Sequence, residues 1–243
     1  TSGPGLSLKS EALGLAVMTE LPLVVVDVQR GGPSTGLPTK TEQSDLVQAL
    51  YGRNGECPVV VMAASTPSDC FHFAFEAGRI AMEHMTPVIL LTDGFIANGS
   101  EPWRIPSMKD YPTIVPPIVD KAPEGGFMPY VRNEKLARGW AFPGKVGLEH
   151  RVGGLEKDSV KGSISHDPAN HQKMVNTRAA KVAKVVEDIP DQTVLGPQEG
   201  ELLVVGWGGT RGNLQSAVMQ MQEEGKSVAL CHLNYINPVP RNL

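Results

Sequence analysis

The feature that most constrains the fold is a set of three short, almost continuously apolar segments rich in β-branched residues. They lie at residues 23–28, 58–63 and 87–92. Helical patterns alternate with them at residues 6–20, 42–51 and 66–85. Strands that lack polar and apolar alternation are buried on both faces, and helices between them are typical of a parallel sheet. The first half of the chain therefore predicts an α/β fold with a parallel sheet.

Residues 94–166 interrupt this pattern. They contain many of the 20 prolines and little hydrophobic periodicity. Irregular segments of this length are uncommon in compact domains unless they have a function. We expect a proline-rich arm that packs on another subunit or domain. Its apolar residues should be partly exposed in the isolated chain, among them Phe95, Trp103, Ile105, Phe127, Trp140 and Phe142.

A second α/β unit is predicted after the arm. Residues 167–186 form a long helix that Asp167 caps, and a linker rich in Pro and Gly follows at 190–200. The next elements are a strand at 202–205, a helix at 211–224 and a strand at 227–231. We therefore expect a domain of residues 1–190 that includes the arm, and the start of another domain at 200–243.

Charge and composition exclude several classes of protein. The formal net charge of −4 provides no basic surface for nucleic acid or anionic lipid. No apolar run approaches the roughly 20 residues that span a bilayer. Cys57, Cys70 and Cys231 lie far apart and form no CxxC pair. Reduced thiols in a cytoplasmic protein are therefore expected, rather than disulfides or a metal site.

The most informative segment is the loop at 29–40, which follows the first strand. It reads QRGGPSTGLPTK. Its glycines let backbone amides approach a ligand, and Arg30 offers a planar fork that matches a carboxylate. Ser34, Thr35 and Thr39 can add further donors. The loop suits a carboxylate or phosphate, but an ordinary connection with a surface arginine fits the same composition.

Two other turns are rich in glycine. Residues 1–5 (TSGPG) open a helix whose free amides could hold an anion, and a tight turn is an equal alternative. Residues 206–212 lie between a strand and a helix, as in a dinucleotide-binding turn. Arg211 takes the place of the third glycine, so we favour close packing over nucleotide binding there.

These segments resemble a known family. Residues 1–8 (TSGPGLSL) and 25–39 (VVDVQRGGPSTGLPT) resemble runs in alpha subunits of the 2-oxoacid:ferredoxin oxidoreductases, and the second run is the more specific. The strand and turn at 203–212 resemble the start of their next domain, which is similar to the C-terminal domain of transketolase. The resemblance covers the whole chain. It implies a thiamine diphosphate-binding fold of the pyrimidine type, followed by that next domain.

The resemblance implies an enzyme that oxidatively decarboxylates a 2-oxoacid to acyl-CoA and CO2 and reduces ferredoxin. It implies thiamine diphosphate with Mg²⁺ and an iron–sulfur cluster, mainly on a beta subunit, with coenzyme A as co-substrate. A gamma-like domain or subunit is a further partner. Arg30 would hold the substrate carboxylate. The other implied site residues are Gly31, Gly32, Thr35 and Thr39 toward the substrate, and Ser2 and Gly3 toward the cofactor.

The chain also departs from the family's pattern. The upstream YPITP motif, the activating glutamate, a GDG-type metal motif and cluster cysteines do not occur in these residues. We therefore expect an incomplete subunit that continues at both ends and is inactive alone. A binding or scaffolding module without chemistry, and a nucleotide-binding domain built on the turn at 206–212, are the alternatives.

Lys40 bears on the choice of substrate. 2-Oxoglutarate presents a second carboxylate, which requires a cation or several donors when it is desolvated. Lys40 lies just beyond Thr39, and residues 39–43 (TKTEQ) resemble the 2-oxoglutarate members more than the pyruvate members. We therefore expect 2-oxoglutarate. A solvated Lys40 that pairs with Glu42 fits the sequence equally well.

Overall fold

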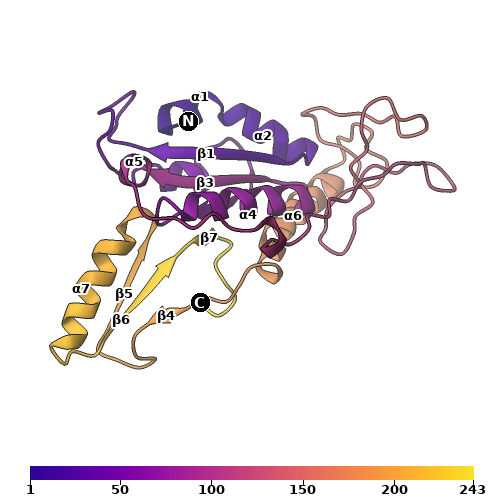
Figure 1. The fold of residues 1–243 in the computed structure, drawn as a ribbon. Coiled ribbons are helices and arrows are strands. Elements are labelled where there is room, and N and C mark those ends of the chain that lie inside the picture. The colour runs from indigo at the N-terminus through magenta and orange to yellow at the C-terminus, as the bar shows by residue number, and fades with distance from the viewer.

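The computed structural model describes residues 1–243, and a four-stranded sheet forms its centre (Figure 1). The strand order is β1-β3-β2-β7. The strands are β1 (Leu23–Gln29), β2 (Val60–Ala63), β3 (Pro87–Asp93) and β7 (Tyr235–Asn237). The first three are parallel, and β7 runs antiparallel to β2. Every residue of β2 and β3 is buried, so the predicted α/β class with a parallel sheet is confirmed.

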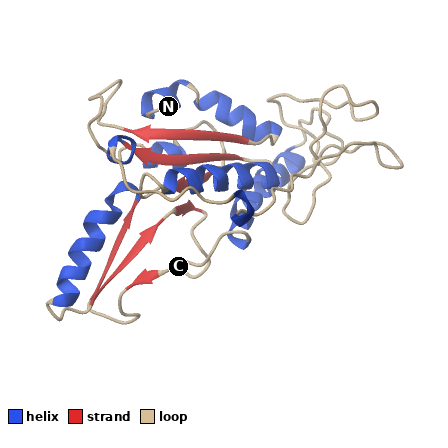
Figure 2. Cartoon of the chain, in the orientation of Figure 1, coloured by secondary structure: helices blue, strands red, loops and turns tan.

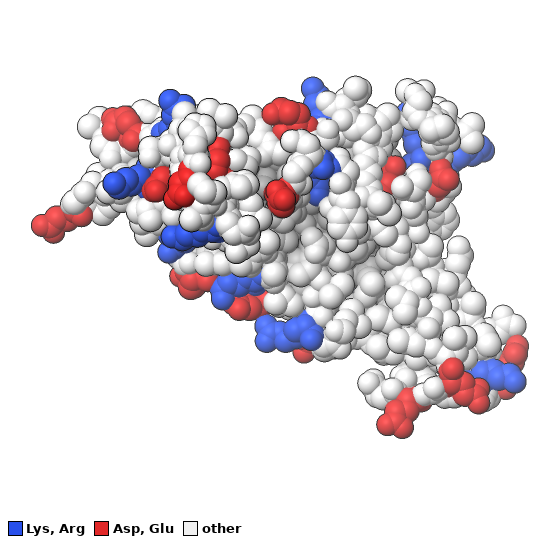
Figure 3. Space-filling model, turned by 180° about the vertical axis from the view of Figure 1, so that it is seen from behind, with Lys and Arg blue, Asp and Glu red and all other residues white.

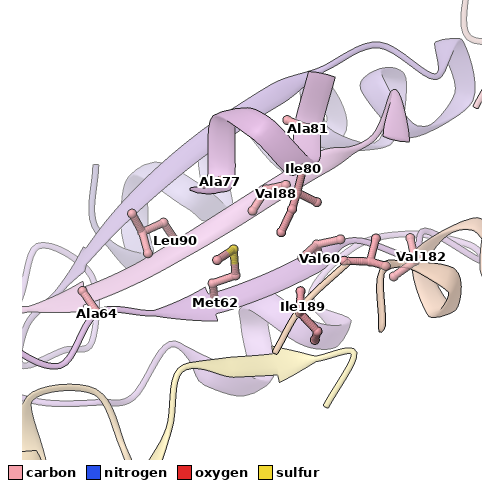
Figure 4. Close-up of a cluster of buried hydrophobic side chains, with 11 residues drawn as sticks. Val60, Met62, Ala64, Ala77, Ile80, Ala81, Val88, Leu90, Val182 and Ile189 are labelled. Atoms are coloured by element: carbon pink, nitrogen blue, oxygen red, sulfur yellow. The ribbon is translucent and has the colours of Figure 1, made fainter. Parts of the chain in front are cut away.

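Helices cover both faces of this sheet. They are α1 (Gly3–Leu8), α2 (Ser10–Thr19) and α3 (Leu46–Tyr51) on one face, and α4 (Asp69–His84) and α6 (Pro168–Lys184) on the other. Successive residues of a strand point to opposite faces. Met62 and Leu90 therefore pack with Ile80 of α4 in the cluster of Figure 4. Val61 and Ile89 pack with Leu13 of α2 on the other face.

A second sheet has the order β4-β6-β5. Its elements are β4 (Val194–Leu195), β5 (Leu202–Trp207) and β6 (Val228–Leu233), with η3 (Gly208–Thr210) and α7 (Arg211–Glu223) between β5 and β6. Val218 of α7 packs on Val228 and Leu230 of β6. The chain then leaves this sheet, because β7 pairs with β2 of the first one. The division into domains at about 190–200 stays a prediction.

The arm at 94–166 has little regular structure, as expected. It contains only α5 (Gly94–Asn98) and η1 (Met108–Asp110), and its loops extend from one end of the molecule (Figure 2). Its apolar residues are partly exposed in the chain by itself, which confirms the prediction. Phe95, Trp103, Ile105 and Phe142 are exposed, and Phe127 and Trp140 are half-buried.

Three expected elements differ in the structure. The helix expected at 6–20 begins at Gly3 and is divided at Lys9, whose φ of −118° departs from helical geometry. The helix expected at 42–51 begins only at Leu46, because the preceding residues are bonded to other elements. The expected linker at 190–200 contains β4, which pairs with β6. The long helix after the arm is capped by Asp167 as expected and continues into η2 (Val185–Glu187).

None of the helices combines the length and apolarity that a membrane crossing requires.

Candidate functional site

A hollow of about 750 Å³ lies where the loop after β1 meets the start of α1. Its walls come from three segments, at residues 3–8, 30–35 and 42–48. The hollow lies at the carboxyl end of β1, where open parallel sheets bind their ligands. Its volume falls in the range of sites for small molecules and cofactors, about 300–1,000 Å³. The loop and the turn that the sequence singled out therefore share one candidate site.

Arg30 lines this hollow, and its Nε is buried without a hydrogen-bond partner in the chain. No carboxylate of the chain forms an ion pair with its guanidinium, although Glu42 and Asp45 line the same hollow. Buried polar groups in proteins nearly always have partners. An unpaired guanidinium beside a hollow is therefore suited to a ligand with a carboxylate or phosphate, which it can bind through two parallel hydrogen bonds.

The amides of Gly31 and Gly32 are bonded within the loop. Gly31 N donates to Lys40 O at 2.9 Å, and Gly32 N donates to Glu42 Oε2 at 2.9 Å. Leu37 N donates to Gly31 O at 2.8 Å, so the loop folds back on itself. The glycines of the loop predict backbone amides that can approach a ligand, but the amides of Gly31 and Gly32 are engaged within the chain.

Of the other residues predicted for the site, some line the hollow and others do not. Thr35 and Gly3 line the hollow. Thr39 and Lys40 are exposed and do not line it. Ser2 precedes α1, is half-buried, and makes no capping hydrogen bond through its side chain.

Gly3 is buried against Asp45, which the sequence did not single out. A Cβ at Gly3 would collide with the Asp45 carboxylate, so any larger residue would require that side chain to move. Gln48 Nε2 donates to Gly3 O at 3.1 Å and adds a second link between α1 and α3. These contacts fix the start of α1 beside the Arg30 loop. No local pattern could have revealed them, because the partners lie more than 40 residues apart.

Two buried carboxyl groups interact here, Asp45 in the lining of the hollow and Asp27 on β1. Both carboxylate oxygens of Asp27 on β1 are buried without partners, and so is Asp45 Oδ2. Burial raises the pKa of Asp27 to about 7, and the charge of Asp45 adds to the increase. Burial also raises the pKa of Asp45. The only signal in the sequence was an acid within an otherwise apolar strand.

Gln29 and Asp93 connect the ends of the strands. Gln29 Nε2 donates to Thr92 O at 3.0 Å, and its Oε1 accepts from Asp45 N at 3.1 Å. Asp93 Oδ1 accepts from the first amides of α5, and its Oδ2 accepts from Gly209 N at 3.1 Å. A Cβ at Gly209 would collide with the Asp93 carboxylate. The turn at 206–212 therefore serves close packing, and the Gly209 amide is engaged within the chain.

The distribution of charge offers no further site. No group of three or more His, Cys, Asp and Glu side chains gathers into a set that could hold a metal ion. All three cysteines are free. Basic and acidic side chains are mixed on the face shown in Figure 3, without a continuous basic surface.

Comparison with known proteins gives a consistent result. Residues 1–166 match the family model for the thiamine diphosphate-binding part of pyruvate flavodoxin/ferredoxin oxidoreductases. The chain is 57% identical to 2-oxoglutarate oxidoreductase subunit KorA of Mycobacterium tuberculosis, across 100% of this chain and 37% of that protein. It is 34% identical to 2-oxoacid:ferredoxin oxidoreductase 1, subunit alpha, of Aeropyrum pernix, across 99% of this chain and 38% of that one.

A solved structure is also similar. It is the 2-oxoglutarate:ferredoxin oxidoreductase from Magnetococcus marinus with 2-oxoglutarate, coenzyme A and succinyl-CoA bound. The TM-score is 0.93 with 36% sequence identity, over 99% of this chain and 42% of that one. The chain therefore spans about two fifths of the length of these proteins.

Proposed function

Because this chain belongs to the pyruvate flavodoxin/ferredoxin oxidoreductase family, we propose that it is part of the alpha subunit of an enzyme that oxidatively decarboxylates a 2-oxoacid. The proposed substrate is 2-oxoglutarate, which is named for the relative of 57% identity and for the similar solved structure. The reaction yields an acyl-CoA and CO2, and two electrons pass to ferredoxin. The chain alone is expected to be inactive, since it spans 37% of that relative's length.

The main structural support for this proposal is the unpaired guanidinium of Arg30. Arg30 binds the C1 carboxylate of the 2-oxoacid through a bidentate pair, and Ser34 and Thr35 supply hydroxyl donors from the same wall of the hollow. The role of Arg30 is to orient the substrate, and it transfers no proton. Orientation by a fixed cation places the 2-oxo carbon for attack and lowers the entropic part of the barrier.

Thiamine diphosphate is the proposed cofactor of the assembled enzyme. When bound, it would supply the nucleophilic carbon and the electron sink that decarboxylation of a 2-oxoacid requires. The hollow is large enough for part of such a cofactor, and the buried, unpaired Asp45 Oδ2 offers an acceptor for an amino group. Ser2 and Gly3, at the start of α1, are the residues that we place toward it.

The remaining groups are assigned to partners. Following the family to which the chain belongs, we place Mg²⁺ and the iron–sulfur cluster mainly on a beta subunit. Coenzyme A is the proposed co-substrate. A gamma-like domain or subunit and ferredoxin complete the assembly. Three free cysteines fit a cytoplasmic location, since thiols persist in reducing compartments.

The test is Arg30→Lys in the assembled enzyme. Lysine keeps the charge but loses the bidentate geometry, and a charge-assisted hydrogen bond of this kind is worth about 1.5–3 kcal/mol. We expect kcat/KM for 2-oxoglutarate to fall roughly ten- to a hundredfold. Thiamine diphosphate content should stay at the wild-type level. The exposed Arg104→Lys is the control.

Two results would contradict the proposal. Wild-type kcat/KM in the Arg30→Lys enzyme would mean that another residue anchors the carboxylate. A purified natural complex without iron–sulfur absorbance and without thiamine diphosphate-dependent oxidation of 2-oxoacids would favour the alternative, a non-catalytic binding or scaffolding module with the same fold.

A further inference from the structure

We propose that Glu42 is a positioning residue for the 2-oxoacid, because its carboxylate closes the loop after β1 and so holds the Arg30 guanidinium toward the hollow. This inference rests on the proposed function and extends it to a residue that does not contact the substrate. Glu42 Oε2 accepts a hydrogen bond of 2.9 Å from Gly32 N, two residues after Arg30.

Glu42 is the only side chain that is hydrogen-bonded to the loop at residues 30–41. The other closing contacts are between backbone groups, from Gly31 N to Lys40 O and from Leu37 N to Gly31 O. Gly36 makes this fold possible, because it has a φ of +56° and any Cβ there would collide with Gly31 O. Glu42 thus joins the start of the loop to the segment that returns from it.

The start of the loop requires such a contact. Gly31 and Gly32 have no side chains, so ordering them costs more backbone entropy than ordering other residues. The guanidinium of Arg30 has no partner in the chain that could fix its direction. Its orientation therefore depends on the backbone that follows it, and the Gly32 amide is the point at which a side chain fixes that backbone.

The position of Glu42 also explains why Arg30 stays available. Both residues line the same hollow, yet no ion pair joins them. The Glu42 carboxylate is instead engaged with the Gly32 amide. A carboxylate that accepts a hydrogen bond from a nearby amide has less reason to pair with a neighbouring cation.

The experiment compares Glu42→Ala with Glu42→Gln in the complete enzyme. Glutamine keeps an acceptor oxygen at the same reach, whereas alanine removes it. We expect Glu42→Ala to lower kcat/KM for 2-oxoglutarate roughly tenfold, and Glu42→Gln to stay within about threefold of the wild type. Amide hydrogen exchange in peptides from residues 31–42 should accelerate in the alanine variant and not in the glutamine variant. Glu199→Ala, at an exposed position, is the control.

Each result decides the matter. Equal losses in both variants would show that the charge matters rather than the hydrogen bond, and would overturn the proposal. Faster exchange in Glu42→Ala with unchanged kcat/KM would overturn it too, because the loop would then be free without effect on the substrate. If the wild-type complex lacks 2-oxoacid oxidation, the proposed function fails, and the exchange data still decide whether Glu42 closes the loop.

Discussion

Two buried carboxylates, Glu20 and Asp27, lie in opposite electrostatic surroundings. Glu20 follows α2 and is bonded to both ends of the Arg132 guanidinium and, at 2.6 Å, to Lys181 Nζ. Burial alone would raise its pKa, but Lys181 and Arg132 together lower it to about 2. Asp27 has no partner, and burial raises its pKa to about 7.

The difference indicates that Glu20 stabilises the fold, whereas Asp27 is associated with the candidate site. Arg132 belongs to the arm and Lys181 to α6, so Glu20 attaches both of them to the first sheet's helices. Arg138 of the arm adds a hydrogen bond of 2.9 Å from Nε to Thr19 O. The later part of the arm therefore packs on its own chain, and the packing of the arm on another subunit or domain stays a prediction. Unpaired groups with shifted pKa values gather at functional sites, and Asp27 interacts with Asp45, which lines the hollow.

The largest expected effect comes from Glu20→Gln. The change leaves Arg132 and Lys181 buried without a counter-charge, and breaking a buried ion pair costs about 3–5 kcal/mol. We expect the free energy of unfolding to fall by about that amount, and proteolysis within residues 94–166 to become faster. Denaturant unfolding of the subunit measures the first effect.

Glu187→Gln is the matched control for this change. Glu187 pairs with Lys184 on the surface at 2.9 Å, and its side chain is 55% exposed. Such pairs contribute less than about 1 kcal/mol. If the two variants lose equal stability, Glu20 is not an anchor and the contrast with Asp27 disappears.

Asp27→Asn should change the free energy of unfolding less than Glu20→Gln does, and should increase it rather than decrease it. Between pH 3.8 and about 7, Asp27 is protonated in the folded state and ionised in the unfolded state. The wild type therefore loses stability as pH rises through this interval. The lowered pKa of Glu20 acts the other way, because its stabilisation is complete above 4.5 and is lost as pH falls toward 2.

We therefore expect Asp27→Asn and the wild type to have equal free energies of unfolding near pH 3.8. Above the raised pKa the variant should gain about 1 kcal/mol, since it avoids a buried, unpaired charge. Unfolding free energies measured across the interval test this. A variant less stable than the wild type on the alkaline side would mean that the ionised Asp27 is stabilised by a contact.

Lys40→Met should give the smallest effect. Lys40 is exposed and lies outside the hollow, so a contact from it to the second carboxylate of 2-oxoglutarate would be screened by water. An exposed pair is worth about 0.2–1 kcal/mol, which predicts that the ratio of kcat/KM for 2-oxoglutarate to that for pyruvate falls by up to about fivefold. Lys9→Met is the control. An unchanged ratio would exclude Lys40 as the contact, and the family assignment would remain.

The sequence by itself determined the elements that depend on neighbouring residues. Apolar runs predicted β1, β2 and β3, and Asp167 before Pro168 predicted the start of α6, because burial patterns and helix caps involve residues a few positions apart. The composition of the Arg30 loop suits a carboxylate or phosphate, but an ordinary connection fits it as well, so the anion site stays a proposal. Each of these inferences needed only local chemistry.

Only the tertiary structure decided which of those residues face one another. Glu20 meets Arg132 and Lys181 across 112 and 161 residues of sequence, and Gly209 meets Asp93 across 116. It also showed that the Gly31 and Gly32 amides are bonded within the loop. Such contacts form when strands and helices pack, so the pattern along the chain carries no record of them. For the same reason, the buried acids Glu20 and Asp27 have pKa values shifted in opposite directions.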